Sequence, residues 1–316
     1  MTPYEDSLLR LVHTDERLVI MTAENRAPIK ELIPLIPGRF VDVGIAEQTL
    51  IGMAAGLALR GRRPIVHALS AFLTMRSFEF IRTDIGISGL PVVMVGYVPG
   101  FLSDANGPTH QAIEDIGLMR LVPSVNVFCP SDQQELAEAL PEILLTEEPW
   151  YIRYLNTNGT TNETGVHLLK IGKPNVVHRG FEICILSYGV LLGYASRAAS
   201  LLERSGISVQ VVNVHTLKPI DTDFLEDCLA HFAMVVIVED HFRLGGLSSI
   251  VAETVAQCHR RIESTGSRVA AIVPLTLGDR WFKPTLFKDV LQWEGFTAEA
   301  LAARIMKQFK HEVSYA

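Results

Sequence analysis

Short apolar runs rich in β-branched residues alternate with helix-length segments along the chain. In the first half, these runs predict strands at residues 17–21, 40–43, 64–68, 91–97, 125–129 and 150–155. In the second half, they predict strands at 182–187, 209–214, 234–239 and 269–273, helices near 191–204 and 222–232, and a final helix at 297–309. Strands joined by helices are typical of parallel sheets covered on both faces, so the pattern predicts an α/β fold.

One stretch interrupts this alternation. Residues 156–165 read Asn-Thr-Asn-Gly-Thr-Thr-Asn-Glu-Thr-Gly and offer no aliphatic side chain that could anchor a packed element. A chain of 316 residues is also long enough for two typical domains. We therefore expect a first domain at residues 1–157 and a second at residues 166–316.

Two helix ends can also be predicted in the first domain. Ser131 and Gln134 have the spacing of a capping box before a helix at 136–145. Gly61 can end a helix that starts near Ile45.

Charge and cysteine content narrow the possible partners and the compartment. The 28 Lys and Arg residues against 35 Asp and Glu residues give a formal charge of −7, which provides no positive field for a nucleic acid. The four cysteines form no CxxC pair and the N-terminus has no signal-peptide pattern, so we expect a reducing, cytoplasmic setting. The uncharged run at 85–103 contains Gly and Pro residues and fits a buried strand with loops better than a membrane span.

Two strand-to-helix junctions carry polar residues that could do chemistry. Glu47 lies in the first turn of a helix after the strand at 40–43, at the edge where open α/β sheets bind ligands. The helix dipole alone would also favour a glutamate there. His110 follows the strand at 91–97 and could exchange a proton or a hydrogen bond with a substrate oxygen, or could be a solvated residue near a helix start.

A third segment is apolar. Phe72, Met75 and Phe78 share one side of a helix predicted to open after Ser70. Core packing is the simplest interpretation of this spacing. The alternative is a wall for a flat heteroaromatic ligand, because aromatic and thioether groups stack on rings.

Four motifs, in this order and at these separations, resemble those of the transketolase family. They are Gly-Ile-Ala-Glu-Gln at 44–48, Ser-Ala-Phe-Leu at 70–73, Gly-Pro-Thr-His-Gln-Ala-Ile-Glu-Asp at 107–115, and Val-Glu-Asp-His at 238–241 followed by Gly-Gly-Leu at 245–247. Together they are specific, and they cover nearly the whole chain. The resemblance implies a pyrimidine-binding domain for thiamine diphosphate followed by a transketolase C-terminal domain.

Full-length members of this family add an N-terminal domain, which binds the cofactor's diphosphate through a divalent metal and a Gly-Asp-Gly motif that this sequence lacks. The resemblance therefore implies the C-terminal subunit of a split transketolase. Such an enzyme transfers a two-carbon ketol unit from a ketose to an aldose, and only together with a separate diphosphate-binding subunit. We expect the two subunits to share thiamine diphosphate in a heterotetramer, with a metal such as Mg²⁺ held by the partner.

The resemblance also implies roles for single residues. Glu47 matches the glutamate that hydrogen-bonds N1′ of the aminopyrimidine, and with His110 it forms the expected catalytic pair. The expected cofactor-binding residues are Glu24, Gly44, Glu47, Phe72, Met75 and Phe78, and the expected substrate-binding residues are Asn106, His110 and Arg153. Glu24 and Asn106 stand where the family usually has aspartate, so we expect a non-standard sugar substrate.

Three alternatives remain. The beta subunit of a 2-oxo acid dehydrogenase has the same two-domain plan and glutamate role, but Gly-Pro-Thr-His-Gln at 107–111 argues against it. A fragment of a 1-deoxyxylulose 5-phosphate synthase is another enzymatic alternative. A scaffold that only binds a partner is the alternative outside enzymes. Consumption of pyruvate or of a ketose would distinguish the enzymes.

Overall fold

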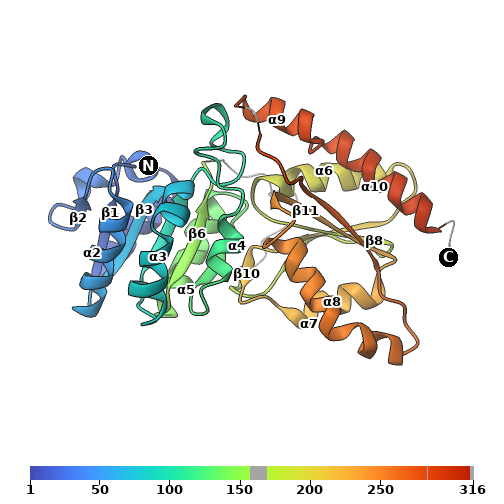
Figure 1. Ribbon diagram of the computed structural model, residues 1–316, viewed down its shortest axis with the longest axis horizontal. Helices are drawn as coiled ribbons and strands as arrows, with labels where there is room; N and C mark the ends of the chain where they lie inside the picture. The colour runs from blue at the N-terminus through green and yellow to red at the C-terminus, as the bar shows by residue number, and fades with distance from the viewer. Residues whose placement is uncertain (157–168, 283, 314–316) are drawn as a thin grey trace.

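The computed structural model describes residues 1–156, 169–282 and 284–313, which form two α/β domains side by side (Figure 1). The first sheet has the strand order β10-β5-β6-β4-β3-β1-β2, and the second has the order β12-β11-β8-β9-β7. The predicted α/β fold with two domains is confirmed. The predicted linker at 156–165 lies, apart from Asn156, outside the described residues.

In the first sheet, neighbouring strands are parallel except where β10 joins β5. Its strands are β1 (Leu18–Thr22), β2 (Phe40–Asp42), β3 (Arg63–Leu69), β4 (Val93–Tyr97), β5 (Asn126–Phe128), β6 (Trp150–Tyr154) and β10 (Thr216–Lys218). In the second sheet, only β7 is antiparallel to its neighbour. The strands there are β7 (Asn175–His178), β8 (Ile183–Ser187), β9 (Val209–Asn213), β11 (Met234–Phe242) and β12 (Ala271–Leu277).

Helices cover both faces of the first sheet because its strands are buried on both sides. Ile20 of β1 packs in the cluster that contains α1 (Pro3–Thr14) and α5 (Gln133–Leu145). Its neighbour Met21 packs in the cluster on the opposite face, with α2 (Glu47–Leu59) and α4 (Asp115–Arg120). Between β3 and β4, π-helical turns at Phe72–Arg76 and Ile81–Gly86 flank the short α3 (Phe78–Phe80).

The second sheet is also covered on both faces (Figure 1). On one face lie α6 (Leu192–Glu203) and α10 (Ala298–Val313), and on the other lie α7 (Thr222–His231) and α8 (Leu247–Ser264). The short α9 (Phe287–Glu294) precedes α10. Short 3₁₀ helices lie between the other elements at Ala27–Ile29, Ile33–Leu35, Asp104–Asn106 and Gly189–Leu191.

The second half of the chain contributes to the first sheet, which the sequence pattern does not predict. The strand β10 pairs antiparallel with β5, and the Cys129 N–H donates to the His215 carbonyl at 2.6 Å. Lys218 Nζ donates to the carbonyls of Arg120 and Val122 at 3.2 and 2.5 Å. The two domains therefore share backbone pairing.

The predicted strands are all present, with ends shifted by a few residues. The predicted capping box of α5 is wrong by one residue, because Asp132 is the N-cap and its Oδ1 accepts from the Glu135 N–H at 2.8 Å. The sequence analysis does not predict α1, α8, α9, β7 or β10. No helix among the described residues is both long and apolar enough to cross a membrane.

Candidate functional site

The candidate residues lie where the parallel strands of the first sheet end. Glu24 follows β1, Glu47 follows β2, Phe72 follows β3 and His110 follows β4. These four strands are neighbours in the sheet, so their carboxyl ends meet at one edge. Ligands bind at this edge in open α/β sheets.

Glu47 is the first residue of α2 and is only 2 % exposed. Its Oε2 accepts a hydrogen bond from Arg76 Nη1 at 2.6 Å, and the Arg76 side chain is 43 % exposed. A buried carboxylate needs such a partner, because an unpaired charge away from water is costly. In the part of the chain that the structure describes, Glu47 Oε1 accepts no hydrogen bond, so one edge of the carboxylate is available to a ligand.

The same arginine links Glu47 to the aromatic residues. The Arg76 guanidinium lies 4.2 Å from the centre of the Phe72 ring, and the Phe72 ring meets the His110 ring edge to face at 4.9 Å between centroids. His110 Nδ1 is 2.8 Å from Thr109 Oγ1. A chain of contacts therefore runs from Glu47 through Arg76 and Phe72 to His110, and joins three predicted site residues from separate segments.

The other two residues of the predicted aromatic wall behave differently. Met75 is 36 % exposed, so the core-packing interpretation is wrong for this side chain. The half-buried Phe78 packs against the core. The buried residues of the π-helical turn at Phe72–Arg76 are instead Leu73 and Thr74.

Asp42 shapes the two turns that hold Glu24 and Gly44. Its Oδ1 accepts from the Glu24 N–H at 3.0 Å and from the Gly44 N–H at 2.9 Å, and both residues have a positive φ. Burial opposes the charged form of Asp42, but the hydrogen bonds from Gly44 and Arg26 outweigh it and lower the pKa of this carboxyl. Asp42 is not among the predicted site residues. The signal that could have identified it is an aspartate at a strand end, just before a glycine.

Glu24 and Asn106 present their side chains to solvent. Among the described residues, the Glu24 carboxylate makes no hydrogen bond or ion pair, so only its backbone is fixed. Asn106 Nδ2 donates to Ser103 Oγ at 3.4 Å. Their expected roles at the cofactor and at the substrate stay predictions.

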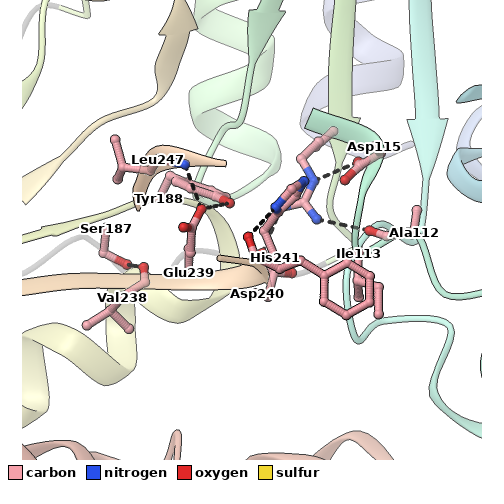
Figure 2. Close-up of polar contacts among 12 residues, drawn as sticks. Ala112, Ile113, Asp115, Ser187, Tyr188, Val238, Glu239, Asp240, His241 and Leu247 are labelled. Atoms are coloured by element: carbon pink, nitrogen blue, oxygen red, sulfur yellow. Dashed lines mark hydrogen bonds and ion pairs between the residues drawn. The ribbon is translucent and has the colours of Figure 1, made fainter. Parts of the chain in front are cut away.

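Arg153 lies in a different environment from the one expected. Its side chain is 2 % exposed, with Nε 2.9 Å from Asp115 Oδ2 and Nη1 2.7 Å from Asp240 Oδ1. Its Nη2 donates to the Ala112 carbonyl at 3.3 Å. Figure 2 shows these three partners, Ala112, Asp115 and Asp240, near one another. Burial disfavours the cation, but the two aspartates outweigh it and raise the arginine pKa. The geometry is that of an ion pair between the domains, and a contact of Arg153 with the substrate stays a prediction.

The second domain also binds the first through its own buried polar groups. His241 Nε2 accepts from the Gly117 N–H at 3.2 Å, and His241 Nδ1 lies 2.7 Å from the Phe242 carbonyl. Glu239 acts within the second domain, where it accepts from Tyr188 Oη and the Leu247 N–H (Figure 2) and from the Ser248 N–H. Asp240 and His241 of the Val-Glu-Asp-His motif make the contacts between the domains.

The residues at the sheet edge fit the pyrimidine half of thiamine diphosphate. The buried Glu47 carboxylate offers a free oxygen next to the half-buried Phe72 ring, and a flat aminopyrimidine needs both an acceptor and an apolar face. No group of three His, Cys, Asp or Glu side chains that could hold a metal ion occurs among the described residues. A divalent metal in the partner stays a prediction.

Comparison with known proteins agrees with the motifs. The family model described as transketolase, pyrimidine binding domain, matches residues 4–160, and that of the transketolase C-terminal domain matches residues 172–301. A 6-deoxy-6-sulfo-D-fructose transketolase subunit from Clostridium sp. (strain MSTE9) is 35% identical over 256 residues, which cover 80% of each chain. A 1-deoxy-D-xylulose-5-phosphate synthase from Synechococcus sp. (strain JA-2-3B'a(2-13)) is 33% identical over 97% of this chain but only 47% of its own length.

Solved structures give the same result. A split gene transketolase, described as an inactive beta4 tetramer, is 29% identical with a TM-score of 0.84, and the match covers 98% of this chain and 97% of that one. A transketolase mutant from Pichia stipitis shares the fold at 16% identity and a TM-score of 0.76, and this chain covers 45% of it. On the motifs, both domain matches and these relatives, the chain belongs to the transketolase family.

Proposed function

We propose that this chain is the pyrimidine-binding subunit of a two-chain transketolase that moves a two-carbon ketol unit from a ketose to an aldose. The observation that carries the proposal is the buried Glu47 carboxylate, which has one free oxygen at the sheet edge beside Phe72 and His110. These side chains can bind the reacting ring of the cofactor as well as the sugar, so they can direct binding energy to the place where the reaction occurs.

The chain's own groups have distinct tasks in this scheme. When bound, thiamine diphosphate supplies a nucleophilic carbon and takes up the electron pair as the carbon–carbon bond of the ketose breaks. Glu47 Oε1 would form a hydrogen bond with the pyrimidine ring nitrogen and share a proton with it. Arg76 holds the other oxygen of that carboxylate, and Phe72 presents an apolar ring. His110 is placed to exchange hydrogen bonds with the sugar oxygens.

The partner subunit supplies the diphosphate site in this proposal. The exposed apolar side chains Ile45, Met53 and Met75 are 73, 42 and 36 % exposed and belong to the segments around Glu47 and Arg76. Exposed apolar residues next to a site favour coverage by another chain. Two relatives are named as subunits or products of split genes, and one of them is described as inactive as a tetramer of its own kind. We propose a heterotetramer with two copies of each subunit.

Substitution of the carboxylate tests the proposal. In the complete assembly with thiamine diphosphate and Mg²⁺, Glu47→Gln removes the group that shares a proton with the ring. We expect kcat for ketol transfer to fall by about 10²- to 10⁴-fold, with an unchanged far-ultraviolet spectrum. The matched control is Glu79→Gln, an exposed carboxylate near the same segment, which should keep at least half of the activity. Full transfer activity in Glu47→Gln would refute the assigned role.

A second candidate is a 1-deoxyxylulose 5-phosphate synthase activity. It is favoured by the 33% identity to a synthase over 97% of this chain. The same assembly supplied with pyruvate, a ketose and an aldose phosphate distinguishes the two. Release of CO₂ from pyruvate would support the synthase, whereas loss of the ketose without CO₂ release would support the transketolase.

A further inference from the structure

The loop at residues 98–114, which connects β4 to α4 and carries His110, is packed largely against the second domain. Its anchor is Phe101, which has no exposed surface and belongs to the hydrophobic cluster of the second domain. The Phe101 ring meets Phe282 at 5.7 Å and Phe296 at 5.6 Å between centroids, both edge to face. We call Phe282 and Phe296 the aromatic platform.

The far end of the loop is held by hydrogen bonds. The Phe242 N–H, at the end of β11, donates to the Ile113 carbonyl at 3.0 Å. The Ala112 carbonyl accepts from the Gly100 N–H at 2.8 Å and from Arg153 Nη2 at 3.3 Å. Figure 2 shows Ala112 and Ile113 beside Asp240 and His241 of the second domain. The residues just after His110 are therefore fixed from both domains.

Two glycines show how closely the second domain approaches the loop backbone. A Cβ at Gly100 would lie 1.7 Å from Asp240 Oδ2, and one at Gly107 would lie 2.6 Å from Pro284 Cγ. Both glycines have a positive φ as well, so other residues would be strained there. In Figure 1 the loop stands at the boundary between the domains, next to α9.

We propose that the aromatic platform and Asp240 are positioning elements, through which the second domain sets the place of His110 at the substrate. This inference rests on the proposed function. Catalytic residues on loops depend on a rigid scaffold, and a displacement of about 1 Å can cost on the order of 10²-fold in rate. The second domain thus acts on the sugar step without touching the sugar. Among the described residues, Glu47 and Phe72 share no hydrogen bond or ring contact with the platform or Asp240, and Phe72 meets the loop at His110. We therefore expect cofactor binding to depend on the platform less than the sugar step does.

The test compares two core truncations in the second domain of the complete assembly. Phe296→Ala removes half of the platform. Its matched control is Leu202→Ala, which lies in the same hydrophobic cluster and is equally buried, but at the end of α6 away from the platform. Phe296→Ala should lower kcat/KM for the ketose at least tenfold relative to Leu202→Ala, with KM for thiamine diphosphate changed less than twofold.

Hydrogen–deuterium exchange of the loop gives a readout that does not depend on activity. In the full chain, the amides of residues 98–114 should exchange at least tenfold faster in Phe296→Ala than in Leu202→Ala. If Phe296→Ala does not fold, Phe296→Leu should show both effects in the same direction and smaller, because an apolar contact to Phe101 is kept.

Two results would overturn the inference: equal kcat/KM losses in the two truncations, or loop exchange unchanged by Phe296→Ala and by Phe296→Leu. A wild-type assembly without any two-carbon transfer would instead refute the proposed function, and the exchange comparison would still decide whether the second domain holds the loop.

Discussion

At the scale of single residues, the site depends on the pairing of Glu47 with Arg76. The carboxylate is 2 % exposed and the guanidinium side chain is 43 % exposed, so the pair joins a buried charge to a half-solvated one. The guanidinium also stacks on Phe72 at 4.2 Å. Arginine suits this place because its planar group can bind a carboxylate and cover a ring at once.

A double-mutant cycle measures this pairing. The free energy of unfolding in urea is measured for the isolated chain and for three variants of it: Glu47→Gln, Arg76→Gln and the double substitution. We expect a coupling free energy of about 1 kcal/mol, near the low end for contacting residues because Arg76 is partly solvated. Strict additivity of the two single effects would show that the ion pair does not form in solution.

The residue motifs predicted part of this site. Glu47, Phe72 and His110 came from local patterns at strand ends, and the structure gathers them. Arg76 was not predicted, because its contact with Glu47 joins segments 29 positions apart along the chain. Arg153 was expected at the substrate, but its partner Asp240 is 87 positions away along the chain, and no local pattern reveals such a contact.

At the scale of elements, long periodic segments were predictable and short edge strands were not. β10 has three residues, too few to show a period, and it forms because β5 offers a free edge. The end of β11 has a second function that its sequence does not reveal, since Asp240, His241 and Phe242 all bind the first domain. Part of the junction between the domains is therefore built from the last residues of one strand.

His241 makes this junction sensitive to acid. Burial lowers the pKa of His241 from 6.5 to about 4, and its neutral Nε2 accepts from the Gly117 N–H. A lowered folded-state pKa gives stability that is complete above pH 6.5 and is lost as the pH falls toward 4. When the pH falls from 7.5 to 5, the free energy of unfolding should drop in both proteins. We expect the drop to be smaller in His241→Gln than in the wild type, by on the order of 2 kcal/mol.

Urea unfolding at the two pH values measures this difference. The control is His231→Gln on α7, an exposed histidine with a side chain 70% exposed, which should keep the wild-type difference between the two pH values. An equal loss in His241→Gln and wild type would contradict the buried neutral imidazole.

At the scale of the whole molecule, the two domains are not independent units. One hydrophobic cluster contains residues of both, including Ile116 and Met119 of α4 and Leu247 of α8. Composition and length predicted two domains. They did not predict a shared core, because a core forms between residues that are far apart along the chain. The chain spans about half the length of the related synthases, 47% in one case.

The most direct test of the central claim is transfer of a labelled two-carbon unit from a ketose to an aldose, with thiamine diphosphate and Mg²⁺ present throughout. The chain, its co-expressed diphosphate-binding subunit and their mixture are assayed in parallel. We predict transfer by the mixture and none by either subunit. Full transfer by this chain alone, or a mixture that binds the cofactor and transfers nothing, would contradict the account.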